Sequence, residues 1–458
     1  MPTKAGILDS EFAAYHEDLE EGRTTCEIRV SEELENVARY NAKLNAFITV
    51  FGGRHGIALS RARELDSTRR SGRTRVSGLY GIPLAVKDNI FVGGFPTTNA
   101  TFAFKDHVPA TNAEIVDEAL GLGCIPLGKT NLHEIALGAT SAASYFGPVR
   151  NPHDPERVSG GSSGGSAVAV VKSKEAVLGL GTDTGGSVRV PAALCGIMGF
   201  KPTIGSLSLE GVFPLSATLD HMGLLTRTMP DMRTAFGALS RKGGGAREKA
   251  TKRKTKVGVL SGLFFEGADE KVRKNFWRAM DLMEASGRFS VTDIPTDPSY
   301  ERFTTARARI QLREAAWFYD ELVDSKEISA RMNPDVVTLL RRGQRFGNLR
   351  YFEANLVRLG SIRVFGALLR SVDVLAMPTT RVVAPRLRDV AGKEAGNLRR
   401  LLLQNTEVFN LCGFPALSIP SNPGSGELPT SVQLACGLGD DAYLLEAGDS
   451  AVQAIAGS

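Results

Sequence analysis

The sequence has few of the residues on which many catalytic and structural sites depend. Five cysteines are scattered over 458 residues without a C-x-x-C pair, and there are only six histidines. This cysteine usage indicates a reduced, cytoplasmic protein with neither a disulfide framework nor a cysteine-based metal site. No segment approaches the roughly 18 consecutive apolar residues of a membrane span, and the acidic N-terminus lacks the apolar centre of a signal peptide. We therefore expect neither a membrane span nor a secreted protein.

Strong charge of one sign is also missing. The formal net charge is only +5, and its main local source is Lys252-Arg253-Lys254 with neighbouring lysines and arginines. A basic run of this kind can bind nucleic acid or can be a solvated loop. Three glycines, Gly243 to Gly245, open the stretch, and no aromatic residues alternate with the charges, so we favour a linker at 241–256 and expect no nucleic-acid partner.

Short β-rich runs alternate with helical stretches such as 113–121 and 165–171, which favours an α/β protein. The predicted strands lie at 82–86, 124–127, 176–180, 256–260, 372–377, 415–420 and 431–434. The predicted layout is one continuous domain with an N-terminal helical layer at 1–70, a core with the chemical motifs at 71–240, a linker at 241–256, a mainly helical region on the substrate side at 257–370 and a return to the sheet at 371–458.

Residues 123–130 match the phosphate-loop pattern G-x4-G-K-[ST] in every position. A phosphate cradle needs successive N–H groups turned inward, but Ile125-Pro126-Leu127 is apolar and has lost one N–H at its proline. The segment therefore predicts a strand rather than a nucleotide site.

Two further patterns point to other hydrolases. Residues 161–165 contain G-x-S-x-G, which would make Ser163 a nucleophile, but the only later histidine is His221, too close in sequence for the usual late catalytic histidine. His133-Glu134 lacks the second histidine of H-E-x-x-H, since position 137 is Leu. Neither an α/β-hydrolase triad nor a zinc-protease site is expected.

Three segments remain, one ending in a lysine and two rich in glycine. Glycine is abundant in the sequence, with 49 residues, and eight of these fall between Gly160 and Gly186. Lys87 ends an apolar strand, where desolvation favours the neutral amine. The Gly/Ser-rich loop 159–166 leads directly into an apolar helix, so it is not a linker. Gly185-Gly186 precedes Ser187, an arrangement that lets N–H groups converge on an oxyanion beside a hydroxyl. Together the segments offer a base, a proton carrier and a nucleophile.

In this order the segments resemble the amidase-signature family, whose members use a Ser-Ser-Lys triad with one serine after a cis peptide bond. The similarity covers nearly the whole chain. The matching blocks are 81–89, 127–134, 146–148, 151–154, 159–166, 181–189, 199–203, 410–416 and 428–434. The resemblance implies one large mixed β-sheet covered by helices on both faces, with a helical insertion.

The resemblance also implies residue roles. Lys87 corresponds to the triad lysine, Ser162 to the serine after the cis peptide bond and Ser187 to the nucleophile. The oxyanion hole is implied at Thr184, Gly185, Gly186 and Ser187. The 170–175 connection is one residue longer than usual in this family, so Ser163 remains an alternative to Ser162.

The resemblance predicts hydrolysis of a small-molecule carboxamide to a carboxylate and ammonia or an amine, without cofactor or metal. The blocks around His133-Glu134 and at 188–196 are most similar to the small-molecule branch, such as indoleacetamide, mandelamide and carboxybiuret hydrolases. The alternatives are a glutaminase subunit of a tRNA-dependent amidotransferase and a non-catalytic binding or scaffold protein. A small-molecule amide is the expected partner, no membrane partner is expected, and a homodimer is left open. The pocket wall is expected from 205–216 and 268–370.

Overall fold

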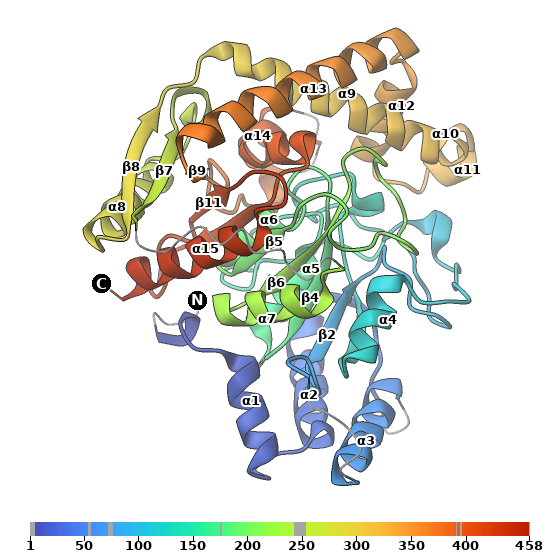
Figure 1. Ribbon diagram of the computed structural model, residues 1–458. Helices are drawn as coiled ribbons and strands as arrows, with labels where there is room; N and C mark the ends of the chain where they lie inside the picture. Colours follow the sequence, from blue (N-terminus) through green and yellow to red (C-terminus); the bar gives the residue numbers. More distant parts are fainter. Residues whose placement is uncertain are drawn as a thin grey trace.

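The fold is built on one mixed sheet with 11 strands in the order β1-β3-β2-β4-β6-β5-β10-β11-β9-β7-β8 (Figure 1). This computed structural model describes residues 5–53, 56–71, 77–174, 176–241, 253–390, 392–393 and 396–457. The strands are β1 (Phe47–Val50), β2 (Pro83–Lys87), β3 (Ile125–Thr130), β4 (Leu178–Asp183), β5 (Met198–Lys201), β6 (His221–Thr226), β7 (Thr255–Leu260), β8 (Phe289–Ile294), β9 (Val374–Pro378), β10 (Ala416–Pro420) and β11 (Ser431–Ala435).

The sheet divides between two stretches of chain. Strands β1 to β6 come from residues 47–226, and strands β7 to β11 come from residues 255–435. The two halves meet at β5 and β10, which pair antiparallel with Phe200 opposite Leu417. Thus the late strands do complete the same sheet as the early ones, as the sequence predicted.

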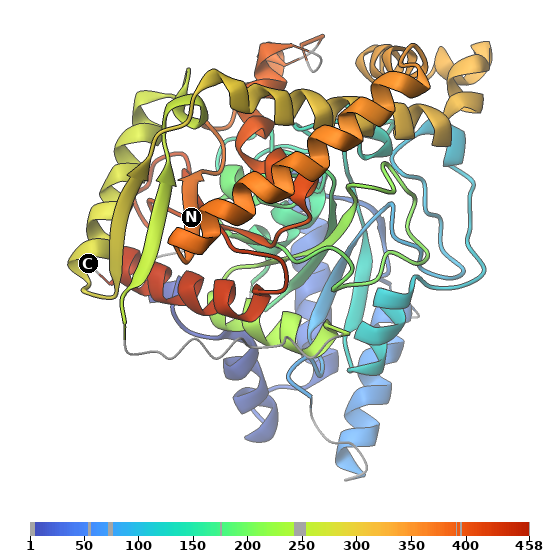
Figure 2. The same ribbon diagram turned by 45° about the horizontal axis from the view of Figure 1, so that its top comes forward.

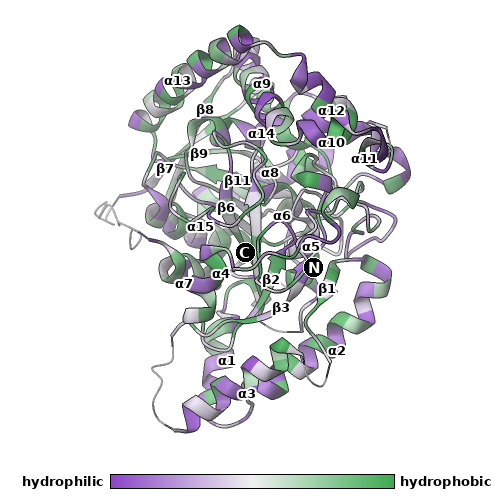
Figure 3. Cartoon of the chain, turned by 90° about the vertical axis from the view of Figure 1, so that its right-hand side faces the viewer, coloured by the Kyte–Doolittle hydropathy of each residue, from purple (hydrophilic) through white to green (hydrophobic). Residues whose placement is uncertain are grey.

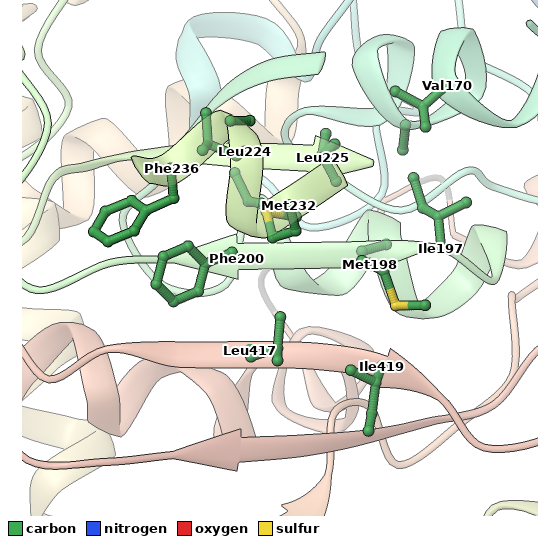
Figure 4. Packing of buried hydrophobic residues seen from close by; sticks show 14 of the residues in the cluster. Val170, Ile197, Met198, Phe200, Leu224, Leu225, Met232, Phe236, Leu417 and Ile419 are labelled. Carbon is green, nitrogen blue, oxygen red and sulfur yellow. The ribbon is translucent and has the colours of Figure 1, made fainter. Parts of the chain in front are cut away.

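The core continues across the junction of the two halves. Figure 4 shows Phe200 and Met198 of β5 beside Leu417 and Ile419 of β10, all fully buried. The ring of Phe200 meets that of Phe236 edge-on at 5.1 Å between centroids. Burial of one such side chain contributes roughly 1.5–3 kcal/mol, so this apolar seam helps hold the two parts of the sheet together.

Helices cover both faces of the sheet (Figure 3). One face carries α7 (Met229–Leu239), α8 (Glu270–Ala285) and α15 (Asp441–Ala456), and the other carries α5 (Gly164–Lys172) and α6 (Arg189–Cys195). The N-terminal helices, at the bottom of Figure 1, are α1 (Glu11–Glu20), α2 (Cys26–Leu44) and α3 (Ile57–Arg70), and α4 (Glu114–Gly121) precedes β3. No helix in the described ranges is long and apolar enough to cross a membrane.

A helical layer lies at the top of Figure 1 and comes forward in Figure 2. It comprises α9 (Glu301–Phe318), α10 (Asp320–Asp324), α11 (Lys326–Ser329), α12 (Pro334–Gln344), α13 (Asn348–Ser371) and α14 (Asn397–Cys412). Helix α9 packs against α12, α13 and α14. This layer corresponds to the predicted helical insertion, extended by α14.

The seven predicted strands are present, but four others were not predicted. Strand β1 lies inside the segment that was expected to be helical, and β8 lies inside the mainly helical region. Strands β5 and β6 form the middle of the sheet. Most of the predicted linker 241–256, and Glu175 of the 170–175 connection, lie outside the described residues.

Candidate active site

Strands β2 and β4 run parallel, so their carboxyl ends meet at one edge of the sheet. Lys87 ends β2 and is fully buried. Its Nζ lies 2.8 Å from Ser162 Oγ and 2.7 Å from Thr182 Oγ1. Burial lowers the pKa of Lys87 to about 7, although the charges of Asp183 and Asp220 oppose this shift. A large fraction of the amine is therefore neutral near pH 7 and able to accept a proton.

Ser162 lies in the glycine-rich loop that leads into α5. The Gly161–Ser162 peptide bond is the only cis bond before a non-proline residue in the described chain, at the position that the resemblance implied. The loop is packed tightly: a Cβ on Gly165 would lie only 2.3 Å from the carbonyl oxygen of Ala46, so a side chain does not fit there. Backbone contact with Asn131, whose carbonyl accepts from Gly165 N–H at 3.0 Å, fixes the loop beside β3.

Ser187 lies on the turn between β4 and α6, and it is 5% exposed. Its carbonyl oxygen accepts the N–H of Ser163 at 3.0 Å, which joins the two serine-bearing loops. Gly186 has φ +130, a value that favours glycine, and a Cβ there would meet Thr406 Oγ1 at 2.2 Å. The turn therefore requires glycine at 186, the second residue of the diglycine that the sequence singled out.

The N–H groups of this turn point in different directions. That of Gly186 donates to Asp183 Oδ1 at 2.8 Å. Within the described part of the chain, the N–H groups of Gly185 and Ser187 donate no backbone hydrogen bond. The hydroxyl of Thr184 donates to Asp220 at 2.5 Å. Of the four residues predicted for the oxyanion hole, Gly185 and Ser187 thus have free donors, while the Gly186 donor holds the turn.

The structure separates Ser162 from Ser163. The Ser163 hydroxyl donates to the carbonyl of Thr182 at 3.2 Å, whereas Ser162 receives the lysine amine. His221 lies on β6 with Nδ1 at 2.8 Å from the carbonyl of Leu219. The contacts of Ser163 and His221 therefore give no nucleophile-elbow pair, and Ser162 is the serine placed beside Lys87.

A small cavity of about 140 Å³ adjoins this cluster. Its single charged lining residue is Asp220, which is buried, and burial raises the pKa of that carboxyl to about 6. The lining is Asn89, Thr182, Thr184, Leu209, Val212, Phe213, Pro214, Leu215, Ala217 and Asp220. Such a cavity suits a small acyl group with an apolar side and few polar contacts. Residues of the segment 205–216, where part of the pocket wall was expected, contribute to this lining, whereas none of the lining residues comes from 268–370.

Within the described ranges, no three His, Cys, Asp or Glu side chains lie close enough together to hold a metal ion. The polar cluster consists instead of an amine, hydroxyls and backbone donors. Its arrangement suits acyl transfer to a serine hydroxyl.

Comparison with known proteins agrees with this geometry. A family model described as Amidase matches residues 29–445. The chain belongs to the amidase family. This confirms the family that the ordered sequence blocks predicted, and the amidase family's large mixed sheet with helices on both faces is the fold observed.

The relatives of this amidase-family chain include both amidases and components of an amidotransferase. A glutamyl-tRNA(Gln) amidotransferase subunit of Archaeoglobus fulgidus is 34% identical over 89% of this chain and 92% of its own length. A solved amidase structure matches with TM-score 0.85 and 32% identity, covering 96% of this chain and 99% of its own. The corresponding amidotransferase subunit of Thermotoga maritima matches with TM-score 0.75 and 27% identity, covering 92% and 90%.

A buried ion pair supports the Ser187 turn, and the sequence analysis gave its two residues no role. Arg189 and Asp183 are fully buried, with Nη2 and Oδ1 2.8 Å apart. All five guanidinium N–H groups of Arg189 have acceptors, on Asp183, Thr406, Asn410 and Gln433. Burial alone would raise the pKa of Asp183, but the Arg189 charge and hydrogen bonds outweigh it and lower the pKa. Asp183 and Arg189 lie on either side of the diglycine in sequence, and this spacing is the one sequence signal that could have indicated the ion pair.

Replacement of Arg189 tests the importance of this pair in the amidase fold. Arg189→Met leaves the Asp183 carboxylate buried without its cation, so we expect the free energy of unfolding to fall by about 3–5 kcal/mol. Urea denaturation followed by circular dichroism measures the change. Arg227→Met is the matched control, because Arg227 pairs with Glu11 at a partly exposed site. Equal small losses in both variants would contradict the expectation.

Proposed function

We propose that the chain hydrolyses a carboxamide through an acyl-enzyme on Ser187. The observation that carries the proposal is the contact between Lys87 and Ser162 beside the Ser187 turn. The Nζ of this buried lysine lies 2.8 Å from Ser162 Oγ, and burial lowers its pKa to about 7. A neutral lysine can accept a proton through a hydroxyl relay, which is what a serine nucleophile requires in the absence of histidine.

The proposed reaction has two halves. Neutral Lys87 takes the hydroxyl proton of Ser162, Ser162 takes that of Ser187, and Ser187 Oγ attacks the amide carbonyl carbon. The N–H groups of Gly185 and Ser187 hold the oxyanion of the tetrahedral intermediate. The relay then returns the proton to the amide nitrogen, the C–N bond breaks and ammonia leaves. Water hydrolyses the ester by the same relay, which releases the carboxylate and restores Ser187.

We propose glutamine as the carboxamide donor. The curated relatives that cover about nine-tenths of this chain, such as that of Archaeoglobus fulgidus, are subunits of an amidotransferase for glutamyl-tRNA(Gln). The cavity also supports an amino-acid substrate, because Asp220 is a carboxylate suited to an α-ammonium group. A protein of this kind would pass its ammonia to a partner protein.

A second candidate is a free-standing amidase for a small amide other than glutamine. The specific support is the structural comparison, since the TM-score is 0.85 with the solved amidase and 0.75 with the solved amidotransferase subunit of Thermotoga maritima. The two candidates share every step at Ser187 and differ in the acyl group that the cavity accepts.

Ammonia release from a panel of amides separates the candidates. We expect glutamine to be hydrolysed, and asparagine, one methylene shorter, to react about 10- to 200-fold more slowly. Glutaramate, which is glutamine without the α-ammonium group, should also react more slowly than glutamine if Asp220 binds that group. Ser187→Ala provides the background rate. Faster hydrolysis of uncharged primary amides or ureido acids than of glutamine would favour the free-standing amidase.

A further inference from the structure

One loop separates the small cavity at the candidate site from a second, outer cavity. We call residues 213–220 the pocket loop. Its inner side lines the small cavity, and its outer side lines a cavity of about 320 Å³ against α9 and α13, with Ala217 contributing to both. The position of this loop therefore determines the shape of the small cavity, which Thr184 of the Ser187 turn also lines.

On the inner side, Asp220 connects the pocket loop to the Ser187 turn. Its Oδ1 accepts the hydroxyl of Thr184 at 2.5 Å. Its Oδ2 accepts the backbone N–H groups of Leu215 at 2.8 Å and Ser216 at 2.9 Å. Because Thr184 adjoins Gly185, these contacts connect the pocket loop through Asp220 to the residue before the Gly185 N–H.

On the outer side, Glu314 of α9 holds the pocket loop. One carboxylate oxygen accepts the hydroxyl of Ser216 and the N–H of Thr218, the latter at 3.1 Å. The other accepts the hydroxyls of Thr218 and of Tyr351 on α13, the latter at 2.7 Å. Three of these four donors belong to the pocket loop. Glu314 is buried, so its charge is stabilised chiefly by these donors.

We propose that Glu314 is a positioning residue for the reaction at Ser187, acting through the pocket loop and Asp220 on Thr184. The proposal rests on the proposed function and adds to it a role for the helical layer. Helices α9 and α13, which lie side by side in Figure 2, thereby set the geometry of a turn that belongs to the β4–α6 connection.

The rate at which a fluorophosphonate phosphonylates Ser187, with loss of fluoride, tests the proposal without knowledge of the substrate. Glu314→Ala leaves the loop donors without an acceptor, and we expect labelling to slow about 10- to 100-fold, the effect of a displacement of about 1 Å. Glu314→Gln should regain most of the rate. Its carbonyl can accept from Thr218 N–H while its amide donates to the two hydroxyls on the other side.

Two comparisons distinguish positioning from general destabilisation. Glu301→Ala removes another carboxylate of α9. Glu301 accepts a hydrogen bond from Arg400 and not from the pocket loop, so the labelling rate of this variant should equal that of the wild type. Thr184→Val removes the hydroxyl at the far end of the chain of contacts. In the variant that combines Glu314→Ala and Thr184→Val, the loss should be smaller than the product of the single losses.

The outcomes are distinct. If the wild type is labelled, two results overturn the positioning role alone. One is a labelling rate in Glu314→Ala equal to that of the wild type, and the other is a loss in the double variant equal to the product of the single losses. A loss in Glu314→Gln as large as in Glu314→Ala also overturns it. Absence of labelling in the wild type overturns the proposed function, and the positioning role with it.

Discussion

Replacement of Ser187 by alanine is expected to abolish both turnover and labelling by a fluorophosphonate. Without the nucleophile no acyl-enzyme forms, and the loss in kcat should reach about 10⁵- to 10⁶-fold, as in serine hydrolases that lack theirs. Ammonia release and mass spectrometry of the intact labelled protein measure the two effects. An unchanged rate would remove Ser187 from the mechanism.

Ser163 is the matched control for this experiment and also for the choice of relay serine. Its hydroxyl donates to the carbonyl of Thr182, whereas the hydrogen bond of Lys87 to a serine in this loop is the one to Ser162. Ser163→Ala should therefore retain most of the activity, while Ser162→Ala loses most of it. The reverse pattern would transfer the relay role to Ser163.

Lys87→Ala is expected to lower kcat/KM by about 10³- to 10⁴-fold and to change its pH dependence. The active form of Lys87 is neutral, and burial lowers its pKa to about 7. In the wild type, kcat/KM should therefore fall about tenfold per pH unit below pH 7 and level off above it. The variant should lose that limb and regain some activity at high pH, where hydroxide replaces the amine.

Lys201 supplies the control for the pH profile. It is also fully buried, burial lowers its pKa to about 7 as well, and its Nζ donates to the carbonyl of Pro202 at 3.0 Å. Lys201→Met should leave the limb near pH 7 in place. Loss of the limb in Lys201→Met, or its persistence in Lys87→Ala, would contradict the assignment of the limb to Lys87.

The strands that could be predicted are those with continuous apolar runs. Strand β2 and strand β10 are buried throughout and bounded by proline or glycine, so composition alone identified them. Strand β5 has only four residues, and β6 begins with the polar His221, so neither stood out from its surroundings in sequence. Their place in the middle of the sheet depends on partners distant in sequence, which local patterns do not reveal.

The sequence allowed us to predict the reactive groups of the candidate site, but not the residues that hold these groups in position. Glycine before Ser187 and lysine at the end of an apolar strand are local signals. Besides Asp183, the acceptors of Arg189 lie more than 200 positions away, on Thr406, Asn410 and Gln433. Asp220 and Glu314 are common acidic residues in sequence. Their importance comes from burial against several donors, a property of tertiary packing.

The distribution of the sheet between two stretches of chain bears on how the protein matures during synthesis. A ribosome has made Lys87, Ser162 and Ser187 well before it reaches the residues that hold Arg189 and the turn in place. Gln433 is the last of these and lies on β11, next to the seam strand β10. A nascent chain thus contains every reactive group of the candidate site before it contains the scaffold, so we expect the observed geometry of the site to form only after β11 has been made.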